Sequence, residues 1–296
     1  MATEQIVIIG GGPAGIAAAI ELKRQGHDPL IYEKNRLGGL LVNANEVINY
    51  PGFPDGIDGI SLADIFKLQA EQGRIRVINS DVTELEFDGD EFRVATTTGS
   101  VSAKYVIVAS GTRPKTIDNL AAETDVREKI VYEVYPIRDA EGKRIVIIGA
   151  GDAAFDYALT LAERNEVTIL NRGSEVKCVP HLWERAGALE SVTYMDTTAV
   201  IPPCGSSPGG LSLACEGPQG RFVIEANYVL PAIGRTAETG FLTKNIAEHR
   251  ESLEARGLLY FIGDVKNGNC RQTGIAVGDG IMAAMRISRQ LERKMK

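Results

Sequence analysis

The glycine pattern at residues 10–15 constrains the fold of this chain more than any other feature of its sequence. Residues 5–35, QIVIIGGGPAGIAAAIELKRQGHDPLIYEKN, predict a buried strand, a glycine turn, an amphipathic helix and a second strand. Gly10, Gly12 and Gly15 form G-x-G-x-x-G in that turn. The first glycine permits the tight turn, the second lets a pyrophosphate approach the backbone, and the third lets helix and strand pack closely.

An acidic residue accompanies this turn. Glu33 ends the second strand, where its carboxylate can accept hydrogen bonds from the ribose hydroxyls of an adenosine. The phosphates would lie at the helix N-terminus, because free N–H groups and the helix dipole favour an anion there. G-x-G-x-x-G alone is weak evidence, but strand, helix, strand and acid together predict a dinucleotide site rather than a purely structural turn.

A second unit of the same plan begins at residue 144. RIVIIGAGDAAFDYALTLAERNEVTILNRG contains Gly149, Gly151 and Ala154 as G-x-G-x-x-A between a strand and a helix. Residues 81–111 alternate apolar and polar positions and predict a small meander of strands. Residues 221–235 predict two more strands, and 258–265 a buried strand. The predicted class is therefore α/β, with two Rossmann-like, three-layer (ββα) dinucleotide-binding domains.

Composition and charge narrow the class of protein. The net charge of −7 argues against nucleic acid as the main partner, because phosphates would be repelled. No run approaches the ~18 apolar residues that a membrane span needs. The N-terminus has no signal-peptide pattern. The cysteines (Cys178, Cys204, Cys215 and Cys270) form no C-x-x-C, which argues against a zinc site or disulfide framework and favours the cytoplasm.

Two mononucleotide folds imply two nucleotides, most economically a flavin facing a nicotinamide with hydride passing between them. Several characteristic segments occur in order along the chain: GGGPAG, LGGLL, EVINYPGFPDGIDG, VIVASGTRP, IVIIGAGDAA, AIGR and FIGDVKNGNCRQTGIAVGDGIMAA. In these segments the chain resembles the flavoprotein family of thioredoxin reductases and thioredoxin-reductase-like ferredoxin–NADP reductases. The resemblance implies a discontinuous FAD-binding domain, residues 1–113 and 239–296, and an NAD(P)-binding domain, residues 114–238.

The resemblance implies FAD contacts spread over both parts of that discontinuous domain. They are Gly10, Gly12, Pro13, Ala14, Gly15, Glu33, Gly39, Leu40, Asn49, Val82, Gly111, Gly263, Asp264, Arg271 and Gln272. Asn49 would face the polar edge of the isoalloxazine, and Asp264 would bond the ribityl or pyrophosphate part. A turn residue and a helix cap are the respective alternatives. Arg271 and Gln272 would direct N–H groups at the N1/O2 end, where donors stabilise a reduced flavin.

The resemblance also implies NAD(P) contacts in the inserted domain. They are Gly149, Gly151, Asp152, Ala153, Asn171, Arg172, Lys177, Gly234 and Arg235. NADPH-specific members carry H-R-R and a further arginine where this chain has LNRGSEVK. Arg172 would still bind a 2′-phosphate, with Lys177 as a second positive charge. The acidic residue that would select NAD is absent. We expect NADPH ahead of NADH, with another electron donor as the open alternative.

The redox C-x-x-C of thioredoxin reductases aligns with Tyr132–Glu133–Val134–Tyr135. Without a dithiol, electrons cannot leave a flavin by the ordinary disulfide relay. The ferredoxin–NADP reductase-like branch also lacks these cysteines, although its usual C-terminal extension is not found in this sequence. The two tyrosines either stack on a ring or pack at the domain junction.

We therefore predict a homodimeric, cytoplasmic FAD-dependent NAD(P)H oxidoreductase. Its acceptor would be a small electron carrier such as ferredoxin or flavodoxin, a quinone or another small molecule. One rival is an atypical disulfide reductase using Cys270, which adjoins Arg271 near the expected flavin edge. In the alternative, Cys270 is a packing residue. A second rival is a flavin-binding protein without turnover.

Overall fold

The computed structural model describes residues 2–121 and 124–295 and divides into two compact units. The first unit comprises Met1–Val42, Val47–Arg113 and Thr236–Lys296. The second comprises Pro114–Arg235 together with the short segment Asn43–Glu46. Each unit contains a parallel sheet with helices, so the predicted α/β class is confirmed.

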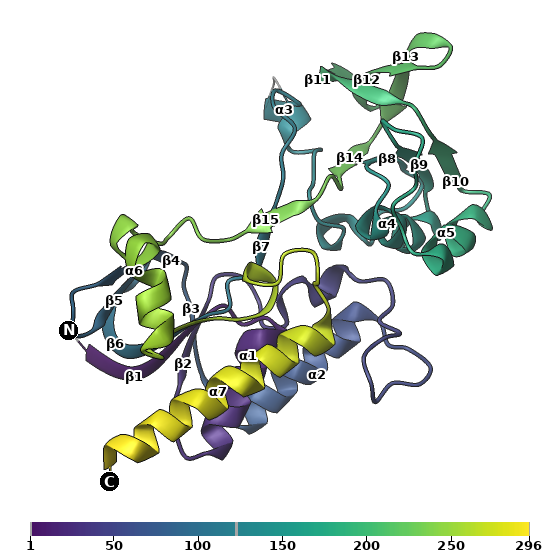
Figure 1. The fold of residues 1–296 in the computed structure, drawn as a ribbon. Helices are drawn as coiled ribbons and strands as arrows, with labels where there is room; N and C mark the ends of the chain where they lie inside the picture. The colour runs from purple at the N-terminus through teal and green to yellow at the C-terminus, as the bar shows by residue number, and fades with distance from the viewer. Residues whose placement is uncertain (1, 122–123, 296) are drawn as a thin grey trace. The chain divides into compact units, whose positions relative to one another are not determined.

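A parallel sheet organises the first unit (Figure 1). Its strands lie in the order β3-β2-β1-β6, with β16 on the far edge of β6. These strands are β1 (Ala2–Ile9), β2 (Leu30–Glu33), β3 (Arg76–Asn79), β6 (Gly99–Val108) and β16 (Leu259–Phe261). β1 is central, and its Val7 lies opposite both Leu30 of β2 and Val106 of β6. Residues 6–9 of β1 are all buried and aliphatic, and such runs are typical of parallel strands covered on both faces.

An antiparallel meander continues this sheet beyond β6. β4 (Val82–Phe87) and β5 (Phe92–Thr96) continue antiparallel from the first half of β6, whereas β16 pairs with its second half. Phe87 and Phe92 of the meander join the apolar core that includes sheet residues. α6 (Lys244–Ala255) contributes Ile246 and Leu253 to the same core.

Three helices pack together in the first unit (Figure 1). They are α1 (Pro13–Arg24), α2 (Gly59–Gln72) and α7 (Thr273–Met295). Two short 3-10 helices also belong to this unit: η1 (Gly39–Asn43), between β2 and α2, and η3 (Gly263–Val265), before α7. α1 and α7 approach unusually closely, because a Cβ on Gly280 would lie 2.3 Å from the Ala14 oxygen. A side chain larger than glycine at 280 would therefore push the two helices apart.

The second unit has two sheets. One is parallel, in the order β10-β9-β8-β14, and consists of β8 (Arg144–Ile148), β9 (Glu166–Leu170), β10 (Val192–Met195) and β14 (Tyr228–Pro231). The other is antiparallel and consists of β11 (Ala199–Ser207), β12 (Gly210–Gly217) and β13 (Gly220–Ala226). The helical elements are α3 (Thr124–Arg127), η2 (Tyr135–Ile137), α4 (Asp152–Ala162) and α5 (Pro180–Gly187).

The chain passes from one unit to the other through two short strands. β7 (Thr112–Pro114) and β15 (Arg235–Ala237) pair with each other at these crossings. Among the described residues, no helix combines the length and apolarity that a membrane span requires. The same residues contain no cluster of three or more His, Cys, Asp or Glu side chains placed to hold a metal.

Candidate functional site

The carboxyl ends of the parallel strands in the first unit gather many of the predicted FAD contacts. Gly10 follows β1, Glu33 ends β2, Val82 lies three residues after β3, Gly111 follows β6 and Gly263 follows β16. Parallel strands bring these ends to one edge of the sheet, where α/β proteins bind ligands. Residues that are far apart in the sequence thus come to one edge.

Packing requires glycine at two positions of the first turn. Gly10 has φ +105°, and a Cβ there would lie 2.3 Å from the oxygen of Ala109. A Cβ on Gly15 would lie 2.0 Å from the oxygen of Gly10. Both distances are far below van der Waals contact, so larger residues would displace β6 or α1.

The N-terminus of α1 has the properties of a pyrophosphate site. Gly12 is its N-cap residue, and within the described part of the chain no side chain caps it. A Cβ on Gly12 would meet no described atom within 4 Å, so space is open there. Gly39 and Gly263 approach the same turn, since their Cβ atoms would lie 3.1 Å from Gly12 Cα and 2.8 Å from Ala14 Cβ. The residues therefore fit a dinucleotide phosphate bound by backbone N–H groups.

Glu33 is buried and joins β2 to the glycine turn. Its Oε2 accepts a hydrogen bond from the Gly11 N–H at 2.6 Å, and its Oε1 accepts one from the Asn35 N–H at 2.8 Å. The carboxylate lies beside the phosphate-binding turn, as an adenosine contact requires. Its contact with a ribose stays a prediction.

Two predicted flavin contacts from distant segments meet directly. The Asn49 Nδ2 donates to the Gln272 Oε1 at 2.6 Å, and both residues are exposed. Leu40 is 38% exposed, and Asp264 is half-buried in η3. The Val82 side chain is buried, which leaves its backbone as the part able to contact a ligand.

Cys270 is an exposed, free cysteine in the turn between η3 and α7. Its N–H donates to the Asn267 oxygen at 2.9 Å. The thiol lies next to Arg271 in sequence and is accessible, as the rival thiol route requires.

Sequence reasoning missed Asp279 of α7, whose side chain contacts three residues of the turn after β16. Its Oδ2 accepts from the Gly263 N–H at 3.0 Å and from the Asn267 Nδ2 at 2.7 Å. Its Oδ1 lies 3.4 Å from the Lys266 ammonium. The only available signal was an acid in VGDG, inside a segment interpreted as an ordinary helix.

The second unit repeats the glycine turn at the carboxyl end of β8. Gly149 has φ +132°, and a Cβ there would lie 2.4 Å from the Ala232 oxygen after β14. Gly151 is the N-cap of α4 without a side-chain cap from any described residue, and no described atom lies within 4 Å of its Cβ position. Ala153 is exposed in the first turn of α4. This helix end also fits a phosphate.

The predicted basic residues of the second unit lie beside this turn. The Lys177 N–H donates to the Ala150 oxygen at 2.9 Å, and the Asp152 carboxylate accepts from the Val179 N–H at 2.9 Å. Both bonds hold residues 177–179 against the start of α4. Arg172 and Lys177 are exposed, which suits contact with a phosphate on a bound nucleotide.

Asn171 has a different surrounding from the other predicted contacts. It is buried, and its Nδ2 donates to the Glu175 oxygen and the Tyr194 hydroxyl, both at 2.9 Å. Its Oδ1 accepts from the Gly173 N–H at 3.1 Å. The side-chain amide therefore holds the loop that carries Arg172, and direct nucleotide contact by Asn171 stays a prediction.

Arg235, another predicted NAD(P) contact, is paired within the second unit. Its Nη1 lies 2.6 Å from the Glu133 Oε1, and the Tyr157 hydroxyl donates to the Glu133 Oε2 at 3.2 Å. Burial raises the pKa of Tyr157, and the negative charge of Glu133 raises it further, so this hydroxyl remains a donor. Gly234, with φ +106°, turns the chain just before Arg235.

Segment 132–135, which the resemblance aligns with the redox cysteines, has two tyrosines in different surroundings. Tyr132 packs against an apolar core of the second unit, and burial raises its pKa. Tyr135 is 39% exposed, while Val134 between Glu133 and Tyr135 is buried. Packing accounts for Tyr132, and Tyr135 is the ring with surface available for stacking.

The three cysteines of the second unit are poor candidates for redox chemistry. Cys204 and Cys215 are buried in the antiparallel sheet, and burial raises the pKa of Cys204 to about 11. Burial also raises the pKa of Cys178. A raised pKa removes the thiolate that disulfide chemistry needs.

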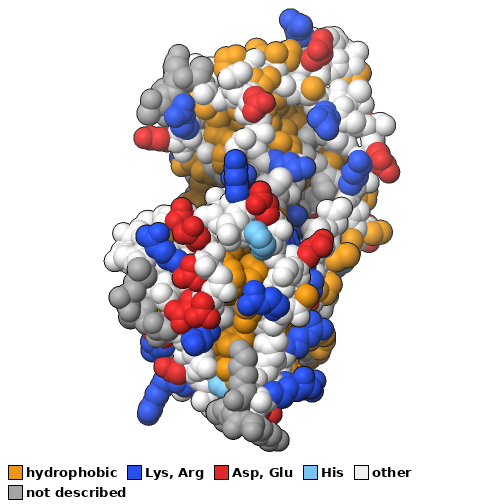
Figure 2. Space-filling view, turned by 60° about the vertical axis from the view of Figure 1, so that its left-hand side comes forward, with side chains coloured by type: hydrophobic (Ala, Val, Ile, Leu, Met, Phe, Trp, Pro, Cys, Tyr) orange, Lys and Arg blue, Asp and Glu red, His pale blue; other side chains and the backbone are white. Residues whose placement is uncertain are grey.

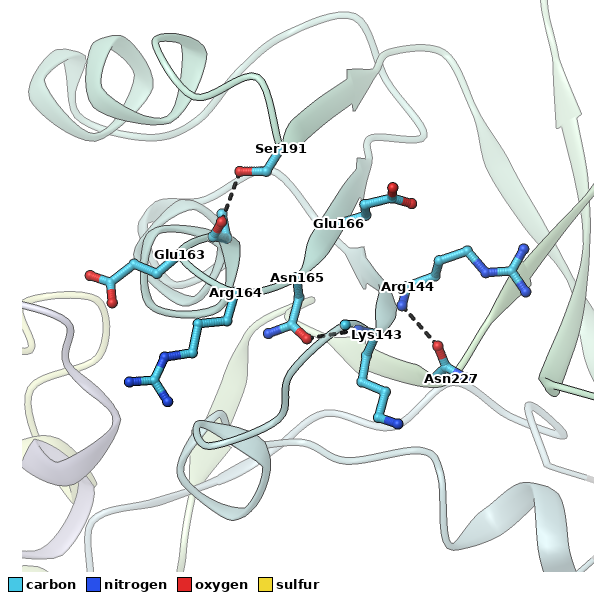
Figure 3. Close-up of a pocket in the computed structure, with 10 residues that line it drawn as sticks. Lys143, Arg144, Glu163, Arg164, Asn165, Glu166, Ser191 and Asn227 are labelled. Atoms are coloured by element: carbon cyan, nitrogen blue, oxygen red, sulfur yellow. Dashed lines mark hydrogen bonds between the residues drawn. The ribbon is translucent and has the colours of Figure 1, made fainter.

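A cavity of about 550 Å³ lies elsewhere in the second unit, at the amino ends of β8 and β9 (Figure 3). Its lining is mainly polar, and Asn165 accepts from the Lys143 N–H at 2.9 Å on one side of it. The predicted nucleotide contacts lie instead at the carboxyl ends of these strands. The cavity is therefore separate from the candidate site.

A family model described as pyridine nucleotide-disulphide oxidoreductase matches residues 4–280. The chain belongs to this family. The thioredoxin reductase of Chlamydia trachomatis is 28% identical over 314 residues, which cover 99% of this chain and 100% of the relative. That of Streptomyces coelicolor is 29% identical, covering 95% and 91%. The crystal structure of T. acidophilum thioredoxin reductase superposes with TM-score 0.84 at 26% identity, covering 98% and 99%.

The family match identifies the class of chemistry. The protein is an oxidoreductase of thioredoxin reductase-like fold, and enzymes of this type use FAD and NADPH. The relatives named here are thioredoxin reductases, so the comparisons favour the thiol–disulfide reductase type over a specific ferredoxin–NADP reductase role.

Proposed function

We propose that this protein is an NADPH-dependent flavoenzyme that passes electrons from FAD to an external acceptor without an intramolecular dithiol. FAD would bind the domain formed by residues 1–113 and 239–296, and NADPH the domain of residues 114–238. The observation that carries the proposal is two open glycine turns, at Gly12 and Gly151, in a chain without C-x-x-C. When bound, FAD supplies the chemistry by accepting a hydride and releasing electrons singly or in pairs.

Backbone groups do most of the binding in this proposal. The α1 N-terminus would hold the FAD phosphates, with Gly39 and Gly263 lining the same space. Asn49 and Gln272 are linked at 2.6 Å and would present polar groups to the flavin. Gly111, Asp264 and Arg271 would complete the contacts.

The α4 N-terminus would hold the nicotinamide nucleotide. Arg172 and Lys177, both exposed, would provide positive charge for a 2′-phosphate. The Asn171 amide keeps the Arg172 loop in place through three hydrogen bonds. Arg235 would contact the nucleotide while it remains paired with Glu133.

The missing dithiol limits the acceptor. Thioredoxin is the substrate named for the relatives, and its reduction by disulfide relay requires two neighbouring thiols. Segment 132–135 supplies tyrosines instead. A ferredoxin, a flavodoxin, a quinone or another small molecule would then take electrons directly. Acidic and basic side chains are interspersed on the face shown in Figure 2, so charge there does not select one carrier.

The test is an anaerobic titration of the purified protein with NADPH and, separately, with NADH. We expect a yellow protein whose flavin absorption bleaches rapidly with NADPH and more slowly with NADH. An acceptor screen with ferredoxin, flavodoxin, quinones and disulfides then identifies the outlet. A colourless protein that takes up no FAD would overturn the proposal, and coloured protein that neither nucleotide bleaches would indicate another donor or a binding role.

A second candidate function, reduction of a disulfide through Cys270, is favoured by the exposure of that thiol. Cys270→Ser separates the two functions. Retained FAD with loss of disulfide reduction supports the thiol route, whereas unchanged turnover removes it. The control is Cys215→Ser, which replaces a buried cysteine of the second unit.

A further inference from the structure

The Asp279 carboxylate of α7 accepts hydrogen bonds from two residues of the turn after β16, Gly263 and Asn267. We propose that Asp279 is a positioning residue for FAD, which holds the 263–267 turn against the phosphate-binding end of α1. The inference rests on the proposed function, because it assumes that FAD binds at this edge of the first unit. No contact between Asp279 and FAD is required.

The donors that contact Asp279 all belong to the turn of residues 263–267. Its side chain is 16% exposed and accepts from the Gly263 N–H at 3.0 Å and from the Asn267 Nδ2 at 2.7 Å. The Lys266 ammonium lies 3.4 Å from the other oxygen and is itself about half exposed, 49%. Exposed ion pairs contribute little, so the bonds to Gly263 and Asn267 carry most of the effect.

The position of Gly263 matters because this residue lies too close to Ala14 of α1 to carry a side chain. Gly263 has φ +69°, and a Cβ on it would lie 2.8 Å from the Ala14 Cβ. Ala14 is in the first turn of α1, next to Gly12 and Pro13. A small shift of Gly263 would therefore change the space beside the helix end that receives the phosphates.

The neighbouring residue fixes the helix that carries Asp279. A Cβ on Gly280 would lie 2.3 Å from the Ala14 oxygen and 2.9 Å from the Ala18 nitrogen. α7 is thus seated on the backbone of α1 immediately beside Asp279. Asp279 and Gly280 together join the turn after β16 to the glycine turn after β1.

The chemistry of the site requires a carboxylate. All three partners of Asp279 are donors, namely a backbone N–H, an amide NH₂ and an ammonium. A carboxylate has two acceptor oxygens and no hydrogen, whereas an asparagine would direct its own NH₂ at one of these donors. Asp279→Asn keeps the size of the side chain and removes this match.

The experiment measures the dissociation constant of FAD for the full-length protein stripped of flavin, by flavin fluorescence. We expect Asp279→Asn to weaken binding about tenfold, as loss of a hydrogen bond to a charged group does. Asp90→Asn, an exposed acid in the turn between β4 and β5, is the matched control and should bind FAD like the wild type. The thermal midpoint is measured with and without FAD for each protein.

The outcomes separate the inference from the proposed function. A merely structural Asp279 would lower the midpoints of the apo and FAD-bound proteins equally, whereas a positioning residue reduces the gain that FAD gives. Wild-type affinity in Asp279→Asn overturns the inference, and a wild type that takes up no FAD overturns the proposed function instead. If Asp279→Asn does not fold, Asn267→Ala decides, with about threefold weaker binding supporting the inference and unchanged binding overturning it.

Discussion

The two units contain the same glycine turn in different surroundings. Gly10 packs on the oxygen of Ala109, and Gly149 on that of Ala232, with Cβ distances of 2.3 and 2.4 Å. The difference lies after the second strand, where the first unit has the carboxylate of Glu33 and the second has the neutral amide of Asn171. The backbone of each turn therefore suits any dinucleotide phosphate, and we expect the residues at the end of the second strand to distinguish the nucleotides.

The largest expected effect tests whether the two turns are equivalent in packing. Gly10→Ala and Gly149→Ala each place a Cβ within 2.4 Å of a carbonyl oxygen, at φ +105° and +132°. We expect each to lower the free energy of unfolding by about 3 kcal/mol or more, measured by chemical denaturation. Gly220→Ala, at the matching φ of +106° but with no described atom within 4 Å of its Cβ position, is the control and should cost less. Equal losses in all three would mean that conformational strain, not packing, fixes these glycines.

Substituting the second glycine of each turn should separate the two units by ligand. Gly12→Ala and Gly151→Ala have ordinary φ angles of −74° and −97° and open space around the new methyl group. Both variants should stay folded. Gly12→Ala should weaken FAD binding and Gly151→Ala NADPH binding, each by about 1.5 to 3 kcal/mol through the lost approach of phosphate to backbone. Loss of both ligands in either variant would contradict independent sites.

Substituting Arg172, an exposed cation after the second strand of the second unit, should have a smaller effect that is specific to NADPH. Arg172→Ala should raise the KM for NADPH about tenfold, because a charge-assisted bond to the 2′-phosphate is lost. The KM for NADH should change little, since NADH has no such phosphate. Steady-state kinetics with both nucleotides provide the measurement, and Arg164→Ala, at the end of α4 beside the separate cavity, is the control. Equal effects on both nucleotides would assign Arg172 to another part of the ligand.

The smallest expected effect concerns Asp156, a carboxylate of the second unit whose pKa is raised by burial. Burial raises the pKa of Asp156 to about 6, an effect opposed by the Asn45 N–H at 2.9 Å and by Arg185, and increased by Asp152 and Glu46. The folded pKa lies above the unfolded value near 3.8, so the folded state favours the proton. This contribution to stability is complete at low pH and is lost as the pH rises through 6.

Asp156→Asn should therefore change stability in a pH-dependent way. The change in stability caused by the substitution should be about 1 kcal/mol more favourable at pH 8 than at pH 5. At pH 8 the substitution removes a buried charge, whereas at pH 5 the wild-type carboxyl is already largely protonated. The weaker bond from Asn45 reduces stability at both pH values. Thermal unfolding across this range gives the measurement. A stability difference that is constant from pH 5 to pH 8 would show that Asp156 titrates normally.

The sequence predicted the parts of this structure that depend on local pattern. Both glycine turns, the strands beside them and the meander follow from short runs of residues, and the strand at 259–261 follows from its apolar character. Gly39 and Gly263 were expected to contact FAD through the resemblance alone, and the structure places both close to the first turn. Their contact with FAD stays a prediction.

Contacts between distant segments lay beyond sequence reasoning. Arg235 pairs with Glu133 across 102 residues, and Asn45 contacts Asp156 across 111 residues. Asn43–Glu46 groups with the second unit, although the prediction placed all of residues 1–113 in one domain. Neither a pairing nor a boundary of this kind leaves a periodic signal, because each depends on how completed elements pack.

The seat of α7 on α1 has a consequence for the order of events during synthesis. The turn at residues 10–15 leaves the ribosome before the second unit does, whereas β16 and Gly280 leave it after the second unit. The strands of the second unit are contiguous in the chain and can assemble while translation continues. The edge of the first unit that carries the glycine turn therefore stays incomplete until the second unit, β16 and α7 have all been synthesised.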